Sequence, residues 1–332
     1  MEKNIEKKPK KGLKAFGITV LVLLIILAIL VGGTYVFINS KLAKMQKVDL
    51  NENDLNVSAQ TEEKLADYRN IAIFGVDSRD DSYDKGNRSD CIIIASINNK
   101  TKVVKLISVY RDTYIQIEGH GLDKITHAYS YGEAPLAIKT LNSNLDLNIK
   151  EFVTVNFDVV KETVDYIGGI SMPITSEEVS QIPGITKAGT YTLNGEQALA
   201  YSRIRHATGG DYKRTERMRD VLTAVVNKVK GLNISKLNGF VDTILPKVYT
   251  NVTSSEIFSM MPSIANYKIT DSIGWPYKTK GITMDRWYGI PITLESNVTQ
   301  LHKEAFGETD YVPSDTIKGI SNKIIEKTGY SK

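Results

Sequence analysis

The chain has 332 residues, of which 42% are hydrophobic and 24% charged. This balance is typical of a folded globular protein and excludes a disordered or coiled-coil chain. The formal net charge is +4, and residues 1–14 account for all of it, because six lysines there face only two glutamates. The rest of the chain carries equal numbers of basic and acidic residues, so no long-range field draws it onto nucleic acid. We therefore expect no nucleic-acid partner.

An uncharged, strongly apolar segment covers residues 15–38. As a helix it would extend about 36 Å, enough to cross a hydrocarbon core of about 30 Å. A cleaved signal peptide has a shorter apolar core and a small-residue cleavage site, which the following residues do not offer. Six lysines precede the segment and three follow it before residue 50. The positive-inside rule then places residues 1–14 in the cytoplasm as a basic tail. The sequence predicts a single-pass signal anchor of the cell membrane, with the rest of the chain extracellular.

The residues after this segment divide into a polar stretch and a folded domain. Residues 39–69 are polar and predict a linker, followed by a domain over residues 70–332. Apolar, β-branched runs of strand length predict strands at 71–76, 91–97, 103–110 and 152–157. The polar turn at 98–102 joins two of them as a hairpin. The one cysteine, Cys91, excludes an intramolecular disulfide and is expected to be a small buried strand residue.

Helices are predicted from apolar residues at helical spacing over 133–145, 158–166, 195–202 and 214–230. Asn194 precedes the third helix, where an asparagine side chain can accept a hydrogen bond from an N-terminal backbone N–H. Gly168 and Gly169 are expected to turn the chain. Because strands and helices alternate, the sequence predicts an α/β fold, an α-β-α sandwich with a central mixed sheet behind one N-terminal transmembrane helix.

The ten arginines are unevenly placed in a chain that otherwise uses lysine. Eight of them form two clusters, namely Arg79, Arg88 and Arg111, and then Arg203, Arg205, Arg214, Arg217 and Arg219. Planar guanidinium groups suit phosphate or carboxylate oxygens, which favours an anion site. The alternative is that these arginines form buried ion pairs with nearby acidic residues. On a helical wheel Arg217 lies about 60° from Arg214, whereas Arg219 lies about 140° away and is expected at the surface.

Two aspartates lie at the ends of neighbouring predicted strands. Asp77 follows the first strand and Asp90 precedes the second. Carboxylates in such positions can hold Mg²⁺ together with waters and substrate phosphate, although aspartate is also common in ordinary turns. The four histidines lack zinc-ligand spacing. No P-loop and no nucleophile elbow occurs in the sequence.

Several ordered stretches resemble the LytR-CpsA-Psr family of bacterial cell-wall proteins. They are IAIFGVDSR (71–79), RSD (88–90), SVYRDTY (108–114), DKITHAY (123–129), VNF (155–157), VDYIGG (164–169), LNGEQALAYSRIR (193–205) and GDYKRTERMR (210–219). The likeness is continuous over about residues 70–230 and weaker to about residue 306. A short basic tail, one anchor and a large outer domain are also the family's arrangement.

The resemblance implies an α-β-α sandwich with a long apolar pocket for a polyprenyl tail. It implies transfer of a glycopolymer from undecaprenyl pyrophosphate to peptidoglycan, with formation of a phosphodiester bond, at the surface of the lipid bilayer. Asp77 and Asp90 would hold Mg²⁺. The diphosphate would be surrounded by Arg79, Arg88, Arg111, Arg203, Arg205, Arg214 and Arg217. Catalytic roles would fall to Arg111, Asp90 and Asp211, with either aspartate as the acceptor of the attacking hydroxyl's proton.

Two residues depart from the family pattern, and two other functions stay open. Tyr110 replaces a usual proline and Met218 a usual glutamine, whose amide hydrogen bonds methionine cannot make, so we expect activity with an altered substrate fit. One alternative is a membrane-anchored, polyprenyl-pyrophosphate-binding regulator of the transcriptional-attenuator type. Both metal aspartates are present, and a tail of about 14 residues has no room for a DNA-binding fold, which disfavours it. The other alternative is a pyrophosphatase, in which water replaces the acceptor hydroxyl.

Overall fold

The computed structural model describes residues 39–41, 43–78, 83–253, 255–257 and 266–331, without the side chains of Asp211 and Ile234. The anchor expected at 15–38 lies outside these residues, as does Arg79. No helix in the described ranges is long and apolar enough to cross a membrane. The chain divides into two units, Met1–Lys44 and Met45–Lys332, and the fold below is that of the second.

Eight strands of the described residues form one sheet in the order β1-β10-β7-β2-β3-β4-β11, with β12 also paired to β4. Their bounds are β1 Gln46–Lys47, β2 Tyr68–Val76, β3 Ser89–Asn98, β4 Val103–Val109, β7 Glu151–Asn156, β10 Tyr249–Thr250, β11 Lys268–Ile269 and β12 Ile273–Trp275. β2 runs antiparallel to β3 and parallel to β7, while β3 and β4 are antiparallel. The sheet is therefore mixed, as the sequence predicts.

The central strands alternate between two cores, because successive side chains of a strand point to opposite faces. Phe74 and Ile94 belong to the large core on one face, whereas Ile73 and Ile93 face the other. The predicted hairpin between β3 and β4 is confirmed. Its turn is held by the Asn98 side chain, which accepts hydrogen bonds from the backbone N–H groups of Lys100 and Thr101 at 3.0 and 2.9 Å.

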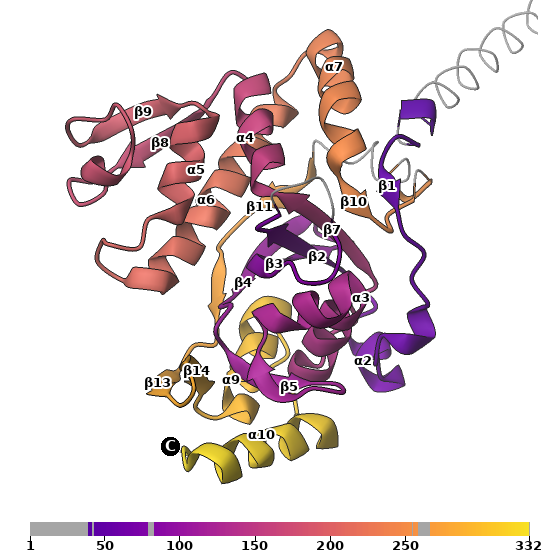
Figure 1. Cartoon of the computed structure of the whole chain (residues 1–332). Coiled ribbons are helices and arrows are strands. Elements are labelled where there is room, and N and C mark those ends of the chain that lie inside the picture. Colours follow the sequence, from indigo (N-terminus) through magenta and orange to yellow (C-terminus); the bar gives the residue numbers. More distant parts are fainter. Residues whose placement is uncertain (1–38, 42, 79–82, 254, 258–265, 332) are drawn as a thin grey trace, which may run out of the picture. The chain divides into compact units, whose positions relative to one another are not determined.

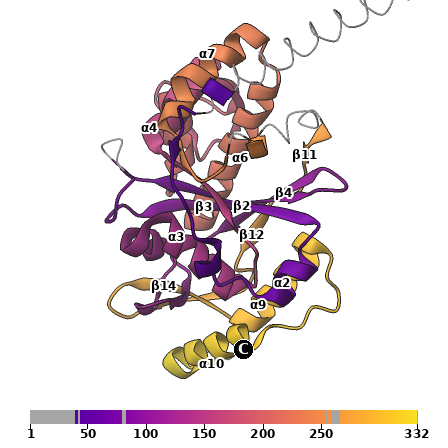
Figure 2. The ribbon, with the colours of Figure 1, turned by 90° about the vertical axis from the view of Figure 1, so that its right-hand side faces the viewer.

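One face of the sheet is covered by α2 (Ala59–Lys64), α3 (Thr126–Leu145), α9 (Leu294–Leu301) and α10 (Asp315–Thr328) (Figure 2). α3 is longer than the predicted helix 133–145, because a short helical segment precedes it across a kink at Gly132 and Glu133. The kink takes Glu133 to a positive φ of 56°. The helix thus brings both the 123–129 motif and the predicted apolar stripe against the same face.

The folded unit begins earlier than the sequence indicated. Within the expected linker 39–69, β1 pairs with β10, and Leu55 and Leu65 are 2% and 0% exposed in the large core. The Asn142 side chain of α3 donates a hydrogen bond to the backbone oxygen of Leu55 at 2.9 Å. Two leucines are enough to pack this otherwise polar segment against the core. The average polarity of the segment therefore places the start of the folded unit too late in the chain.

The other face is covered by α4 (Phe157–Tyr166), α5 (Gly195–Arg203), α6 (Gly210–Lys230) and α7 (Ile234–Ile244) (Figures 1 and 2). The structure confirms the N-cap prediction for α5, because the Asn194 side chain accepts from the Gln197 N–H, and Gln197 completes a capping box. α6 begins four residues before the predicted start. Together these layers form the α-β-α sandwich.

Among the described residues, three hairpins outside the main sheet were not predicted. They are β5–β6 (Tyr114–Ile117, Gly121–Lys124), β8–β9 (Ile170–Ile174, Gly189–Leu193) and β13–β14 (Thr279–Thr283, Trp287–Pro291). Gly168 and Gly169, both at positive φ, make the turn into β8. The short helical turns are 3₁₀ at Glu52–Asp54, Val179–Gln181 and Leu245–Lys247, and π-helical at His302–Phe306.

Candidate functional site

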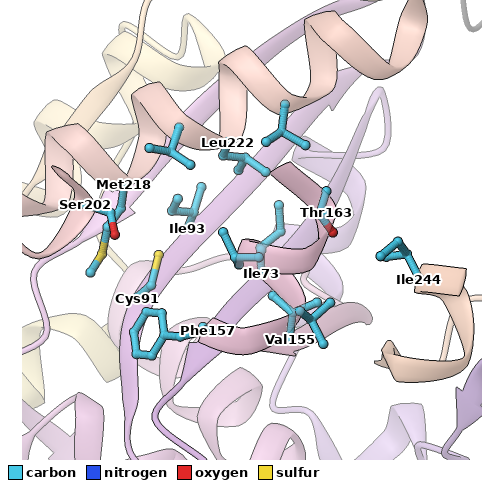
Figure 3. Close-up of a pocket in the computed structure, with 15 residues that line it drawn as sticks. Ile73, Cys91, Ile93, Val155, Phe157, Thr163, Ser202, Met218, Leu222 and Ile244 are labelled. Carbon is cyan, nitrogen blue, oxygen red and sulfur yellow. The ribbon is translucent and has the colours of Figure 1, made fainter. Parts of the chain in front are cut away.

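An apolar cavity of about 190 Å³ lies between β2, β3 and β7 and the helices α4 to α7 (Figure 3). Its walls are mostly aliphatic, with Thr163, Ser202 and Cys91 as the polar exceptions. Ser202, Met218, Cys91 and Phe157 gather at one end of the cavity, and Thr163 and Ile244 lie at the other. The shape and lining suit a linear hydrocarbon.

A close approach of β2 and β3 forms one wall of this cavity. A Cβ added at Gly75 would lie 2.8 Å from the Cβ of Cys91, so only glycine lets the strands keep this spacing with the thiol beside it. Burial raises the pKa of Cys91 to about 12, despite the nearby Arg214 guanidinium. The thiol is therefore a wall group and not a nucleophile.

Charged residues lie just beyond the Phe157 end of the cavity, at the ends of β2 and β3. The backbone N–H of Asp77 donates to the backbone oxygen of Arg88, which places these two residues opposite each other. The guanidinium of Arg203 lies 4.5 Å from the centre of the Phe157 ring and 3.7 Å from the Asp77 carboxylate. The side chains of Arg203 and Asp77 are 49% and 63% exposed. We name Asp77, Arg88 and Arg203 the mouth cluster.

Arg111 organises the carboxylates at the adjacent strand end. Its Nη1 lies 2.7 Å from Asp90, and its Nε lies 3.3 Å from Asp112, which also pairs with Lys124 at 2.6 Å. The Thr126 hydroxyl donates to the backbone oxygen of Ser89 at 2.9 Å, which ties the start of α3 to β3. Asp90 is thus fixed in position by a charge-assisted hydrogen bond.

The arginines of α6 are buried, with Arg214, Arg217 and Arg219 only 2%, 5% and 8% exposed. Arg217 forms a buried ion pair with Glu178 at 2.7 Å and donates to the backbone oxygen of Ile204. Burial raises the pKa of Glu178, but hydrogen bonds from the Thr175 backbone and from Arg217 outweigh it and lower the pKa overall. The sequence left open whether these arginines form an anion site or buried ion pairs, and Arg217 forms a buried ion pair.

The expected surface position of Arg219 is wrong. Its Nη1 donates to the backbone oxygen of Ile273 on β12 at 3.2 Å. A helical wheel assumes that one side of a helix is buried and the opposite side is exposed. Because β12 packs on a second side of α6, Arg219 is buried as well. Arg205 is exposed, as is Arg203, because Ile204 between them turns into the core. Asp211 lies in the first turn of α6.

Sequence reasoning assigned no role to a cluster within the 123–129 motif. The carboxylate of Asp123 contacts the Nδ1 of His127 at 2.7 Å and accepts from the Tyr131 hydroxyl at 2.7 Å. Burial raises the pKa of Asp123, but hydrogen bonds from Tyr131, His127 and the Lys124 backbone N–H contribute to lowering it overall. Two sequence signals were available. Asp123 and His127 have i, i+4 spacing, and Lys124 is the neighbour of Asp123.

Within the described ranges, no group of three or more histidine, cysteine or acidic side chains is arranged as a metal site. Asp77 and Asp90 directly follow Val76 and Ser89, which are paired across β2 and β3. Two carboxylates at one sheet edge are the kind of ligand set that a Mg²⁺ ion takes when it keeps waters and phosphate oxygens as its other ligands. The donor set therefore fits the ion that the sequence implied.

A model of the LytR_cpsA_psr family matches residues 32–299. The chain belongs to this family. It is 32% identical over 299 residues to polyisoprenyl-teichoic acid–peptidoglycan teichoic acid transferase TagT of Bacillus subtilis, covering 85% of this chain and 92% of TagT. It is 33% identical over 260 residues to TagU of Enterococcus faecalis, covering 77% and 83%.

Solved structures of similar fold agree with this family assignment. The structure of TagT bound to LIIa-WTA has a TM-score of 0.58 at 26% identity, covering 80% of this chain and 92% of that one. An Enterococcus faecalis protein described as a transcriptional regulator has a TM-score of 0.63 at 26% identity, covering 80% and 97%. The central mixed sheet expected from the resemblance is therefore the family's fold.

The two departures from the family pattern have structural settings. Met218 lies in the cavity wall, where its thioether side chain adds to the apolar lining. Tyr110 approaches β12 so closely that a Cβ at Gly274 would lie 2.1 Å from the tyrosine oxygen. Glycine at position 274 thus makes room for the tyrosine.

Proposed function

We propose that this protein is a phosphotransferase that moves a glycopolymer from undecaprenyl pyrophosphate to peptidoglycan, forming a phosphodiester bond in cell-wall assembly. The observation that carries the proposal is an apolar cavity whose Phe157 end adjoins the charged mouth cluster. A polyprenyl diphosphate has the same order of parts, a hydrocarbon next to a doubly charged head. The names of the relatives TagT and TagU support the same reaction.

The apolar walls would take part of the polyprenyl chain, because burying hydrocarbon against aliphatic side chains is favourable. The diphosphate would then lie among Arg88, Arg203 and Arg111. The Arg203 guanidinium contacts the Phe157 ring and the Asp77 carboxylate, so it is oriented before the substrate binds. Preoriented positive groups stabilise the charge that develops on phosphoryl oxygens in the transition state.

The acceptor hydroxyl of peptidoglycan would attack the phosphorus that carries the saccharide. The new oxygen–phosphorus bond forms as the bond to the bridging oxygen breaks, and polyprenyl phosphate leaves. The hydroxyl proton passes to a carboxylate, for which Asp90, held by Arg111, and Asp211 are the candidates. Mg²⁺ held by Asp77 and Asp90 would supply further charge neutralisation at the diphosphate.

We also propose that residues 15–38 anchor the protein in the cell membrane with the catalytic unit outside. A cysteine introduced in residues 1–14 should be shielded from an impermeant thiol reagent in intact cells, whereas one introduced at Val312, which is 63% exposed, should react. The opposite labelling pattern would refute the orientation.

The reaction is tested with the full-length protein in detergent, a polyprenyl-diphosphate-linked saccharide and peptidoglycan fragments. Mass spectrometry should find a saccharide–phosphate–peptidoglycan adduct that requires Mg²⁺ and is lost with EDTA or in Asp77→Ala. Saccharide phosphate without an adduct would instead support the pyrophosphatase. Tight lipid binding without turnover would support the regulator, and either result would reject the transferase.

A further inference from the structure

A second pocket, of about 220 Å³, lies where the β13–β14 hairpin meets the end of β4 and the start of α6. Figure 1 shows this hairpin close to β5. Three aromatic residues line the pocket, namely Tyr110, Tyr212 and Trp287, together with Thr279, Asp112 and glycines. Its lining combines aromatic rings with a hydroxyl and a carboxylate, unlike the aliphatic cavity.

Trp287 is 44% exposed, although a large aromatic side chain is normally buried. Its ring lies against Gly281 and Gly289, which are paired across the hairpin. A Cβ at Gly281 would lie 2.7 Å from the indole nitrogen and one at Gly289 would lie 3.5 Å from the ring. The two glycines therefore seat the ring against the hairpin backbone while leaving much of it open to solvent.

Tyr212 forms the facing wall and is 41% exposed. Its ring meets Tyr110 edge-to-face, with centroids 4.5 Å apart and planes at 76°. Its hydroxyl lies 2.5 Å from the Thr279 hydroxyl, which joins α6 to the hairpin. Both aromatic walls are thus fixed in place before any ligand binds, which lowers the entropic cost of binding.

The pocket adjoins the proposed reaction site through Arg111. Tyr110 and Asp112, which line the pocket, are the chain neighbours of this arginine. The Asp112 carboxylate also pairs with Arg111, which in turn pairs with Asp90. A group in the pocket would therefore lie beside a phosphate held by Arg111. A hydrocarbon tail does not suit the carboxylate and hydroxyl, and a phosphate would meet the negative charge of Asp112.

We propose that this aromatic pocket is a saccharide subsite that holds one pyranose ring beside the reacting phosphate. The C–H face of a pyranose is apolar and packs on aromatic rings, whereas its hydroxyls can bond to Thr279 and Asp112. The inference rests on the proposed transfer between two saccharide-bearing molecules. The ring belongs either to the glycopolymer next to the diphosphate or to the peptidoglycan acceptor, and these two sources can be separated.

Intrinsic fluorescence gives a direct binding test, because the chain has two tryptophans and Trp275 is fully buried. The full-length protein in detergent is titrated with N-acetylglucosamine 1-phosphate for the donor side. A tetrasaccharide of alternating N-acetylglucosamine and N-acetylmuramic acid represents the acceptor side. One of them should change the emission of the wild type but not of Trp287→Phe. No change with either sugar, or the same change with inorganic phosphate alone, would overturn the subsite.

Kinetics separate this inference from the proposed function. Trp287→Ala should raise the KM about tenfold for the substrate, donor or acceptor, whose saccharide changes the fluorescence. The variant should bind saccharide-free polyprenyl diphosphate as wild type does, and its thermal unfolding midpoint should be unchanged. Met284→Ala, at an exposed apolar residue between the strands of the same hairpin, is the matched control and should change neither. An unchanged KM in folded Trp287→Ala overturns the subsite while transfer stands. Saccharide-dependent emission without transfer rejects the transferase and leaves the subsite.

Discussion

Arg203 and Arg217 differ most clearly in what surrounds their guanidinium groups. Arg203 is half exposed beside Phe157 and Asp77, whereas Arg217 is buried against Glu178. Both fall within one sequence cluster and both match the family pattern. Position in the fold therefore distinguishes an exposed arginine, beside the proposed diphosphate site, from an arginine whose described partners are buried.

Arg203→Ala should lower transfer by roughly tenfold to a hundredfold, because a charge-assisted contact worth about 1.5–3 kcal/mol is lost. Its stability should change by no more than about 0.5 kcal/mol, as for other exposed residues. Arg203→Lys keeps the charge but not the fork, and should recover only part of the rate. Turnover by mass spectrometry and urea unfolding measure the two effects, and full activity in Arg203→Ala would remove this residue from the site.

Arg217→Ala should show the opposite pattern. The variant leaves the Glu178 carboxylate buried without its partner, which costs about 3–5 kcal/mol of unfolding free energy. Adding Glu178→Gln to the same protein should recover part of the loss, because the uncompensated charge is gone. A urea midpoint equal to wild type, combined with lost lipid-diphosphate binding, would show instead that Arg217 serves the substrate.

The Asp123 carboxylate gives a pH prediction. Hydrogen bonds from Tyr131 and His127 lower its pKa in the folded protein against the opposing effect of burial. A lowered folded pKa stabilises the protein above the unfolded value of about 3.9, and this contribution is lost as pH falls through the folded pKa. The free energy of unfolding, measured from about pH 5 downward, should therefore fall less steeply in Asp123→Asn than in wild type. Parallel pH profiles would contradict the contribution.

At the scale of elements, local patterns predicted the structure where one signal dominated. The β3–β4 hairpin, the α5 cap at Asn194 and the apolar stripe of α6 each follow from neighbouring residues. The β13–β14 hairpin was missed because it lacks a strong turn signal, and its bridge from Gly289 to Thr113 joins distant parts of the chain. Arg219 was misplaced for the same reason, since its partner on β12 is 54 residues away.

Gly75→Ala tests whether the spacing of β2 and β3 sets the site. Its Cβ would lie 2.8 Å from the Cβ of Cys91, so the strands must separate beside Asp77 and the cavity wall. We expect a stability loss of about 1–3 kcal/mol from overpacking, together with weaker binding of saccharide-free polyprenyl diphosphate. Gly75→Ala combined with Cys91→Gly removes the opposing Cβ and should restore both. A single variant with normal stability and binding would mean that the strands adjust without effect.

At the scale of the whole molecule, the sequence predicted the central mixed sheet but not how far the folded unit extends. The motifs begin near residue 70, whereas the compact unit begins at Met45. The segment before the motifs is mostly polar and contributes Leu55 and Leu65 to the main core. These two side chains and the pairing of β1 with β10 make the segment part of the folded unit, and an average over composition does not detect either feature.

Removing this segment should therefore destabilise the fold. A fragment of residues 66–332 keeps β2 but loses β1, α2 and both leucines, whereas a fragment of residues 45–332 keeps them. Burial of each leucine contributes about 1.5–3 kcal/mol, so the shorter fragment should lose about 3–6 kcal/mol of unfolding free energy. Leu55→Ala in the longer fragment should lose about 2–5 kcal/mol by the same route. Urea midpoints measure all three proteins, and equal midpoints for the two fragments would show that residues 45–65 are a linker after all.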